Sequence, residues 1–183
     1  MKFNYAKYAF GLTIAVVLSA WTFPNPWKEF ISIDGKFKAL FPGKVVEKTN
    51  EIETAIGTLT YHTFLHQSPE NDADNLVYMI SYCIYPRNAI HSDSLDLIDE
   101  FFDTTVATAV ESVGGNLQYS SEISLRDYPG RIWKVAYNED KALIKTKSFL
   151  IGNRYYSIQT ITLKEKALNS STDKFLDSFY LID

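Results

Sequence analysis

Two histidines four residues apart are the first candidates for chemistry in this sequence. His62 and His66 have the spacing at which histidines on one face of a helix bind zinc. Residues 58–66, however, are rich in the β-branched and aromatic types that favour a strand. On a strand the two side chains stand about 13 Å apart, whereas zinc holds each nitrogen at about 2.1 Å. We therefore expect two exposed imidazoles that do not share a metal ion.

Acidic residues follow in a polar segment. Glu70, Asp72 and Asp74 could form a calcium loop, because hard cations bind clustered carboxylates. The run lacks the glycine and the distal glutamate of the twelve-residue calcium loop, so we expect a solvated hairpin tip. The alternative is a hydrolase or metal-dependent enzyme in which the two histidines, Glu70 and Asp72 assemble around a hairpin end.

Four further carboxylates lie close together at Asp96, Asp99, Glu100 and Asp103. They could dock a basic partner or supply a carboxylate pair for acid–base catalysis. Near the start of a helix, however, the helix dipole stabilises carboxylates without any functional role. We therefore expect a solvated helix face.

Nucleophilic catalysis has no recognisable pattern in the chain. There is no Gly-x-Ser-x-Gly elbow, and residues 91–93 (His-Ser-Asp) are adjacent, so their side chains point in different directions. The single cysteine, Cys83, lies in an apolar run and has no partner for a disulfide, which indicates a small buried hydrophobic residue. No glycine-rich phosphate loop is present either. The sequence predicts neither a convergent catalytic set nor a cofactor.

Aromatic residues offer a different kind of site. The chain has 12 tyrosines and 3 tryptophans, which could stack on sugars or line an apolar groove, although strand formation and core packing account for most of them. If a groove lies beside the sheet, strand alternation places five residues near it: Tyr61, Tyr82, Tyr128, Trp133 and Tyr156.

The N-terminus has the order of an export signal. Lys2 and Lys7 precede the uncharged residues 8–23, and the small residues Ser19 and Ala20 offer a cleavage point. Leu18 fits that cleavage pattern poorly, and 16 uncharged residues are slightly fewer than a membrane span needs. Residues 1–23 are therefore a signal peptide or an N-terminal membrane anchor. In both cases the domain is delivered outside the inner membrane, as a periplasmic, extracellular or inner-membrane-anchored protein.

Charge makes nucleic acid a poor partner. The formal net charge is −4, and it is −6 without the two N-terminal lysines. Phosphate backbones are bound by clustered Lys and Arg, whereas the basic residues here are scattered among acidic ones.

Residues 27–183 read as a single α+β domain. Alternating or apolar segments predict strands at 31–33, 37–41, 45–54, 58–66, 76–85, 116–125, 131–138, 142–151 and 155–163. Apolar residues from 95 to 113 recur at helical spacing, with a cap at 92–93 and an end at 114–115, and 170–179 predicts a short last helix. We expect an antiparallel meander of about seven or eight strands, with one long inserted helix and a short C-terminal helix packed on the sheet.

Four motifs together resemble a known group of proteins. They are Trp27…Phe30-x-Ser-x-Asp-Gly-x-Phe37…Phe41-Pro-Gly, a glycine between two strands at position 57, Tyr-Pro-Gly-Arg at 128–131, and Phe-Leu-Asp-Ser-Phe at 175–179. They resemble uncharacterised exported bacterial proteins, many of them lipoproteins, whose fold is similar to the Mog1/PsbP-like group. The resemblance spans 27–183 and implies the fold. One type in the wider group associates with a photosystem and another with a small GTPase, but no contact motif of either type is present. The lipid-acceptor cysteine of the lipoprotein members is absent as well.

These observations favour a non-catalytic binding or accessory protein of the cell envelope. Its expected partner is an envelope protein or a small ligand, with membrane contact only through an uncleaved N-terminal segment.

Overall fold

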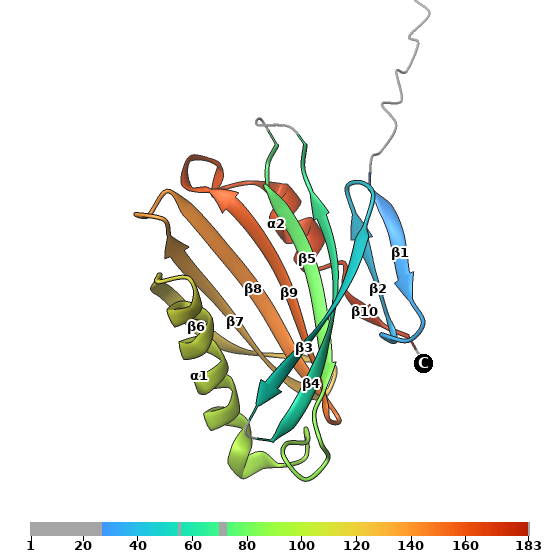
Figure 1. Ribbon diagram of the computed structural model, residues 1–183. Helices are drawn as coiled ribbons and strands as arrows, with labels where there is room; N and C mark the ends of the chain where they lie inside the picture. Colours follow the sequence, from blue (N-terminus) through green and yellow to red (C-terminus); the bar gives the residue numbers. More distant parts are fainter. Residues whose placement is uncertain (1–26, 55, 70–72, 183) are drawn as a thin grey trace, which may run out of the picture.

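The computed structural model describes residues 27–54, 56–69 and 73–182 (Figure 1). They form strands and helices in the order expected for an α+β fold. The first half contains β1 (Lys28–Ser32), β2 (Phe37–Phe41), β3 (Val46–Thr54), β4 (Gly57–Gln67), β5 (Val77–Ile84) and α1 (Leu95–Ser112). The second half contains β6 (Asn116–Leu125), β7 (Tyr128–Tyr137), β8 (Ala142–Ile151), β9 (Arg154–Leu163), the 3₁₀ turn η1 (Lys164–Lys166), α2 (Ser170–Leu176) and β10 (Tyr180–Leu181).

Seven strands form one large antiparallel sheet in the order β3-β4-β5-β9-β8-β7-β6. Two meanders, β3 to β5 and β6 to β9, meet where β5 pairs with β9. α1 carries the chain from β5 to the far edge of the sheet (Figure 1). The predicted α+β class is confirmed, and the apolar run at 76–85 is an interior strand as expected.

Three short strands form a second sheet in the order β1-β2-β10. The predicted fold has a single sheet, so this second sheet was not expected from the sequence. The predicted two-residue Asp-Gly turn between β1 and β2 is wrong: a four-residue turn spans 33–36 and its positive φ of 53° falls on Lys36. Gly35 is required for space, because a Cβ there would lie 2.7 Å from the Phe37 ring. β10 is only two residues long, too short for alternation to predict it.

The main core lies on one face of the large sheet, under the small sheet and α2 (Figure 1). Strand alternation directs every second side chain of β4, β5, β8 and β9 to this face. Its buried members are Phe37, Ala39, Phe41, Phe64, Tyr78, Ile80, Tyr82, Phe149, Tyr156, Ile158, Phe175, Leu176 and Phe179.

α1 covers the opposite face near β6 and β7 (Figure 1). Ile98, Phe102 and Val106 are its buried side chains. Leu95, predicted to belong to this apolar stripe, is 80% exposed and stands at the first position of the helix. The N-cap is Ser94 rather than 92 or 93, whereas the predicted end holds: Gly114 follows the C-cap with φ +56°.

The motif at 128–131 does not form the predicted turn. β7 already begins at Tyr128, and the turn lies one step earlier, where Arg126 has φ 55°. Gly130 is a strand residue over which the Phe149 ring packs, and a Cβ there would come within 2.5 Å of that ring. Glycine serves close packing here rather than chain reversal.

The predicted signal peptide or anchor, residues 1–23, lies outside the described residues. Within the parts of the chain that are described, no helix is long and apolar enough to span a membrane.

Candidate functional site

A cavity of about 480 Å³ lies between α1 and the ends of β4, β5 and β9. Its walls contain four aromatic residues, Tyr61, Tyr85, Phe101 and Tyr155. Four aliphatic residues complete its apolar lining: Ile56, Ala89, Ile90 and Leu97. The cavity falls in the size range of small-molecule sites, and its mainly apolar lining is typical of them.

Phe101 joins the helix side of the cavity to the sheet side. Its ring contacts Tyr85 with centroids 5.5 Å apart at 84°, and Tyr155 with centroids 5.7 Å apart at 78°. Tyr155 belongs to β9 and Tyr85 directly follows β5, where the Tyr85 amide donates to the Asn153 carbonyl (2.8 Å). Because the ring planes are nearly perpendicular, the three rings do not stack on one another and leave a hollow between them.

A buried thiol lies beside two phenols of the cavity wall, those of Tyr61 and Tyr85. Cys83 is fully buried, and burial raises the pKa of its thiol to about 11, although hydrogen bonding to Tyr61 and Tyr85 acts in the opposite direction. Burial also raises the pKa of Tyr61 and that of Tyr155 above their ordinary value. All these groups are therefore protonated and neutral near pH 7, which leaves no thiolate to act as a nucleophile.

α1 contributes the polar part of the lining. Thr104, Thr105 and Thr108 face the cavity, and the Thr105 hydroxyl donates to the Phe101 carbonyl (2.7 Å). Glu100 lies in the same wall. The arrangement offers apolar surface and a few hydroxyls, with one carboxylate at the edge.

The five aromatic residues predicted to lie near one groove are divided between the two faces of the sheet. Tyr61 lines the cavity, and Trp133 packs under α1 with Val106. Tyr82 and Tyr156 belong to the opposite core, where the Tyr156 hydroxyl donates to the Gly35 carbonyl (2.8 Å). Tyr128 lies near the turn between β6 and β7, in another hollow.

Sequence reasoning missed Tyr85, Phe101 and Tyr155 as cavity residues. Phe101 is adjacent in sequence to Phe102, one of the buried residues of α1, so helical spacing places Phe101 beside the buried face of the helix and not on it. Tyr155 and Tyr156 are adjacent on a strand, so their side chains point to opposite faces of the sheet. Once the pairing of β5 with β9 is known, Tyr155 is placed on the face that α1 covers. Only the strand order, which the sequence does not supply, brings the three together.

The candidate metal ligands do not converge. His62 stacks on Tyr82 with centroids 4.8 Å apart, and Nδ1 of His66 lies 3.0 Å from the Lys44 carbonyl oxygen. Glu70 and Asp72 lie outside the described residues. Among the residues that the structure does describe, no group of three or more His, Cys, Asp or Glu side chains could hold a metal ion.

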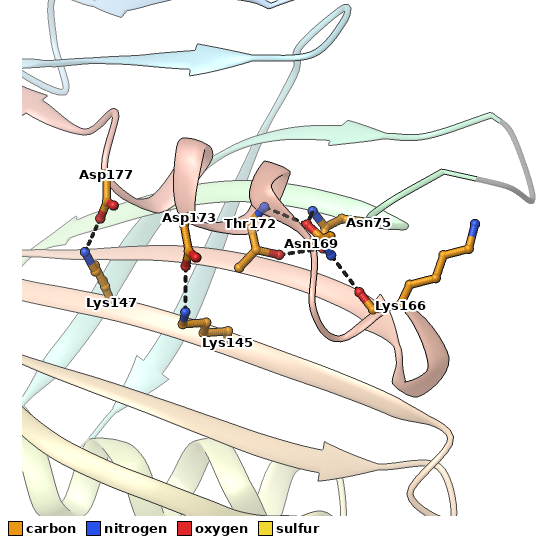
Figure 2. Close-up of polar contacts among 8 residues, drawn as sticks. All are labelled: Asn75, Lys145, Lys147, Lys166, Asn169, Thr172, Asp173 and Asp177. Atoms are coloured by element: carbon orange, nitrogen blue, oxygen red, sulfur yellow. Dashed lines mark hydrogen bonds and ion pairs between the residues drawn. The ribbon is translucent and has the colours of Figure 1, made fainter.

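A second polar cluster fixes α2 to the sheet (Figure 2). Asn75 is fully buried, and its Oδ1 accepts from the Thr172 hydroxyl at 2.8 Å and from Asn169 Nδ2 at 3.3 Å. Asn169 caps the helix by accepting from the Thr172 amide (2.8 Å). Partners within the protein account for these contacts, so the cluster is structural.

Two ion pairs extend this attachment along α2 (Figure 2). Lys145 Nζ lies 2.8 Å from an Asp173 oxygen, and Lys147 pairs with Asp177 at the helix C-cap. Both lysines project from β8 on the face that α2 covers. Each lysine is matched by a carboxylate of the helix, which makes them part of the fold rather than an anion site.

Among comparisons with known proteins, similarity is found in the structure and not in the sequence. No protein-family model matches the chain, and no curated protein gives a significant sequence match. The solution structure of cyanobacterial PsbP (CyanoP) from Synechocystis sp. PCC 6803 is similar, with a TM-score of 0.56 over 88% of this chain and 95% of that chain. The chain has a PsbP-like fold. Sequence identity to that structure is 10%, so the PsbP-like similarity concerns the fold and not a ligand or partner.

Proposed function

We propose that this chain is a non-catalytic binding or accessory protein of the cell envelope, and that the aromatic cavity beside α1 is its binding site. One observation carries the proposal: four aromatic rings from α1, β4, β9 and the end of β5 border an open hollow of about 480 Å³ on a face that the main core does not use. Cavities of this size with apolar walls and few polar groups are typical of ligand sites. The PsbP-like fold is consistent with an accessory role.

Binding is favoured over catalysis by the chemistry of the lining. Burial raises the pKa of the Cys83 thiol to about 11 and raises that of Tyr61 as well, so neither acts as a base or nucleophile near pH 7. Glu100 has no partner in the lining that would form an acid–base pair with it. We therefore advance no enzymatic activity.

The envelope location rests on the N-terminal sequence. Lysines, an apolar stretch and small residues within 1–23 follow the order of an export signal. A fusion of the full chain to a phosphatase reporter that is active only after export should give activity. A fusion that lacks residues 1–23 should give none, and equal activity of the two fusions would contradict export by this segment.

Binding is tested with a neutral fluorescent probe, N-phenyl-1-naphthylamine. We expect one saturable site on the wild-type protein. Thr104→Trp fills the cavity from its exposed helix wall and should weaken binding at least tenfold. Ala107→Trp places the same side chain on another exposed position of α1 that does not line the cavity, and should leave binding unchanged. Absence of saturable binding, or equal affinity in all three proteins, would overturn the proposal.

A further inference from the structure

The charge in the cavity wall comes from one residue. Among the described residues that line the cavity, Glu100 carries the only carboxylate, and no Lys, Arg or His accompanies it. The tyrosines are neutral for the reason given above. The cavity therefore presents a negative charge beside apolar rings, and offers an anion no counter-charge.

The carboxylate of Glu100 is also free to pair with a ligand. The neighbouring carboxylates Asp99 and Asp103 are held by Arg131, with shortest N–O distances of 3.8 and 3.2 Å. Within the described part of the chain, no basic side chain lies within 4 Å of the Glu100 carboxylate. Glu100 stands beyond the first turn of α1, where the positive end of the helix dipole has little effect.

The aromatic walls favour the same sign of ligand charge. Tyr85, Phe101 and Tyr155 stand at steep angles to one another around the hollow. The faces of aromatic rings carry the negative end of the ring quadrupole and attract ammonium groups within about 6 Å of the ring centroid. Several rings with one exposed carboxylate and no basic residue form a suitable environment for an ammonium group.

We infer that the cavity beside α1 selects organic cations, that is, molecules with an apolar or aromatic body and an amine or quaternary ammonium group, with Glu100 as the counter-ion. The inference rests on the proposed function, because it names the ligand class of the same cavity. Fatty acids and other carboxylates with a similar apolar body should bind more weakly, because the same charge repels them.

Three probes with a common phenyl-alkyl body separate charge from shape: 3-phenylpropylammonium, 3-phenylpropanol and 3-phenylpropanoate. Calorimetric titration at pH 7.5 should rank their affinities in that order, with the ammonium probe at least tenfold tighter than the carboxylate. Glu100→Gln keeps the side-chain shape and should weaken binding of the ammonium probe about three- to fivefold, within the range for an exposed ion pair. It should leave 3-phenylpropanol unchanged.

Glu111→Gln is the matched control, since it removes the same charge from the same helix about 16 Å along its axis and outside the cavity lining. If the alcohol binds as tightly as the ammonium probe and Glu100→Gln changes neither, the inference fails while the binding site stands. If none of the three probes binds, and N-phenyl-1-naphthylamine does not bind either, the binding site itself is wrong. Equal losses in the Glu100 and Glu111 variants would show a long-range charge effect and would also overturn the inference.

Discussion

Arg131 on β7 reaches Asp103 on α1, with its Nη2 3.2 Å from the carboxylate Oδ1. Its guanidinium also lies over the Phe102 ring, 5.9 Å from the centroid, and only 11% of its side chain is exposed. This contact fastens the helix that forms one wall of the cavity to the sheet that forms the other. The cavity therefore depends on a buried arginine outside its own lining.

Arg131→Ala should lower the free energy of unfolding by about 2–3 kcal/mol, because it removes both a charge partner and a packed aliphatic stem. Arg131→Met keeps the stem and should cost about half as much. Urea unfolding followed by circular dichroism gives both values. A loss below about 0.5 kcal/mol for Arg131→Ala would contradict the role assigned to this contact.

Asn75 is the buried centre of the α2 attachment. Asn75→Ala leaves the Thr172 hydroxyl without its acceptor and should cost about 2–3 kcal/mol. Asn169→Ala removes the helix cap and should cost about 1 kcal/mol. Asn50→Ala on the exposed strand β3 is the control and should be neutral. Thermal unfolding of the three variants checks the ranking, and an Asn75 variant no weaker than the Asn50 variant would refute it.

Glycine is required at positions 130 and 114 for different reasons, which a pair of alanine variants can separate. At Gly130 a Cβ would lie 2.4 Å from the Ser148 carbonyl oxygen, so Gly130→Ala should cost about 2–3 kcal/mol through overpacking. At Gly114 a Cβ meets no atom within 4 Å, and the cost of about 1 kcal/mol comes from the positive φ alone. Urea unfolding of both proteins measures the difference. Equal losses would contradict the packing assigned to Gly130.

Alkaline pH should destabilise the fold through the groups beneath the cavity. Burial raises the pKa of the Cys83 thiol from 9.0 to about 11. Between these values the unfolded chain has lost the thiol proton while the folded chain retains it, so stability is complete below pH 9 and falls as pH rises toward 11. Burial raises the pKa of Tyr61 and Tyr155, which adds to the same trend.

The measurement is the free energy of unfolding at several pH values from 8 to 11. Cys83→Ala should show a shallower decline than the wild-type protein, because it removes one of the titrating groups. A flat profile, or a decline of equal slope in the variant, would contradict the burial assigned to this thiol.

Local patterns predicted most elements because each element here carries its own signal. The β-branched residues at 45–54, the apolar run at 76–85 and the helical spacing from 98 onward are each signals within one short segment, and all three predictions match the structure. The two-residue strand β10 carries no periodic signal, and its pairing with β2 joins distant parts of the chain. A glycine in the sequence can indicate either a turn or close packing. Gly130 was interpreted as part of a turn, whereas it lies in a strand and leaves space for the Phe149 ring.

The cavity could not be predicted because it is a product of strand order. Tyr61, Phe101 and Tyr155 come from three separate elements, and they meet only because β9 returns to pair with β5 while α1 crosses the same face. Alternation grouped Tyr61 and Trp133, which lie on the face that α1 covers, with two tyrosines of the opposite face. It could not separate them from Tyr82 and Tyr156, since the facing of each strand depends on its register with its neighbours.

Ligand binding in the cavity beside α1 can be followed through backbone amide signals in NMR spectra while 3-phenylpropylammonium is added. We expect saturable shifts that are concentrated at Tyr61, Tyr85, Ile90, Tyr155 and along 97–108 of α1, and that are lost in Thr104→Trp. Shifts that are scattered over the surface, or that gather around α2 and the small sheet, would contradict binding in this cavity.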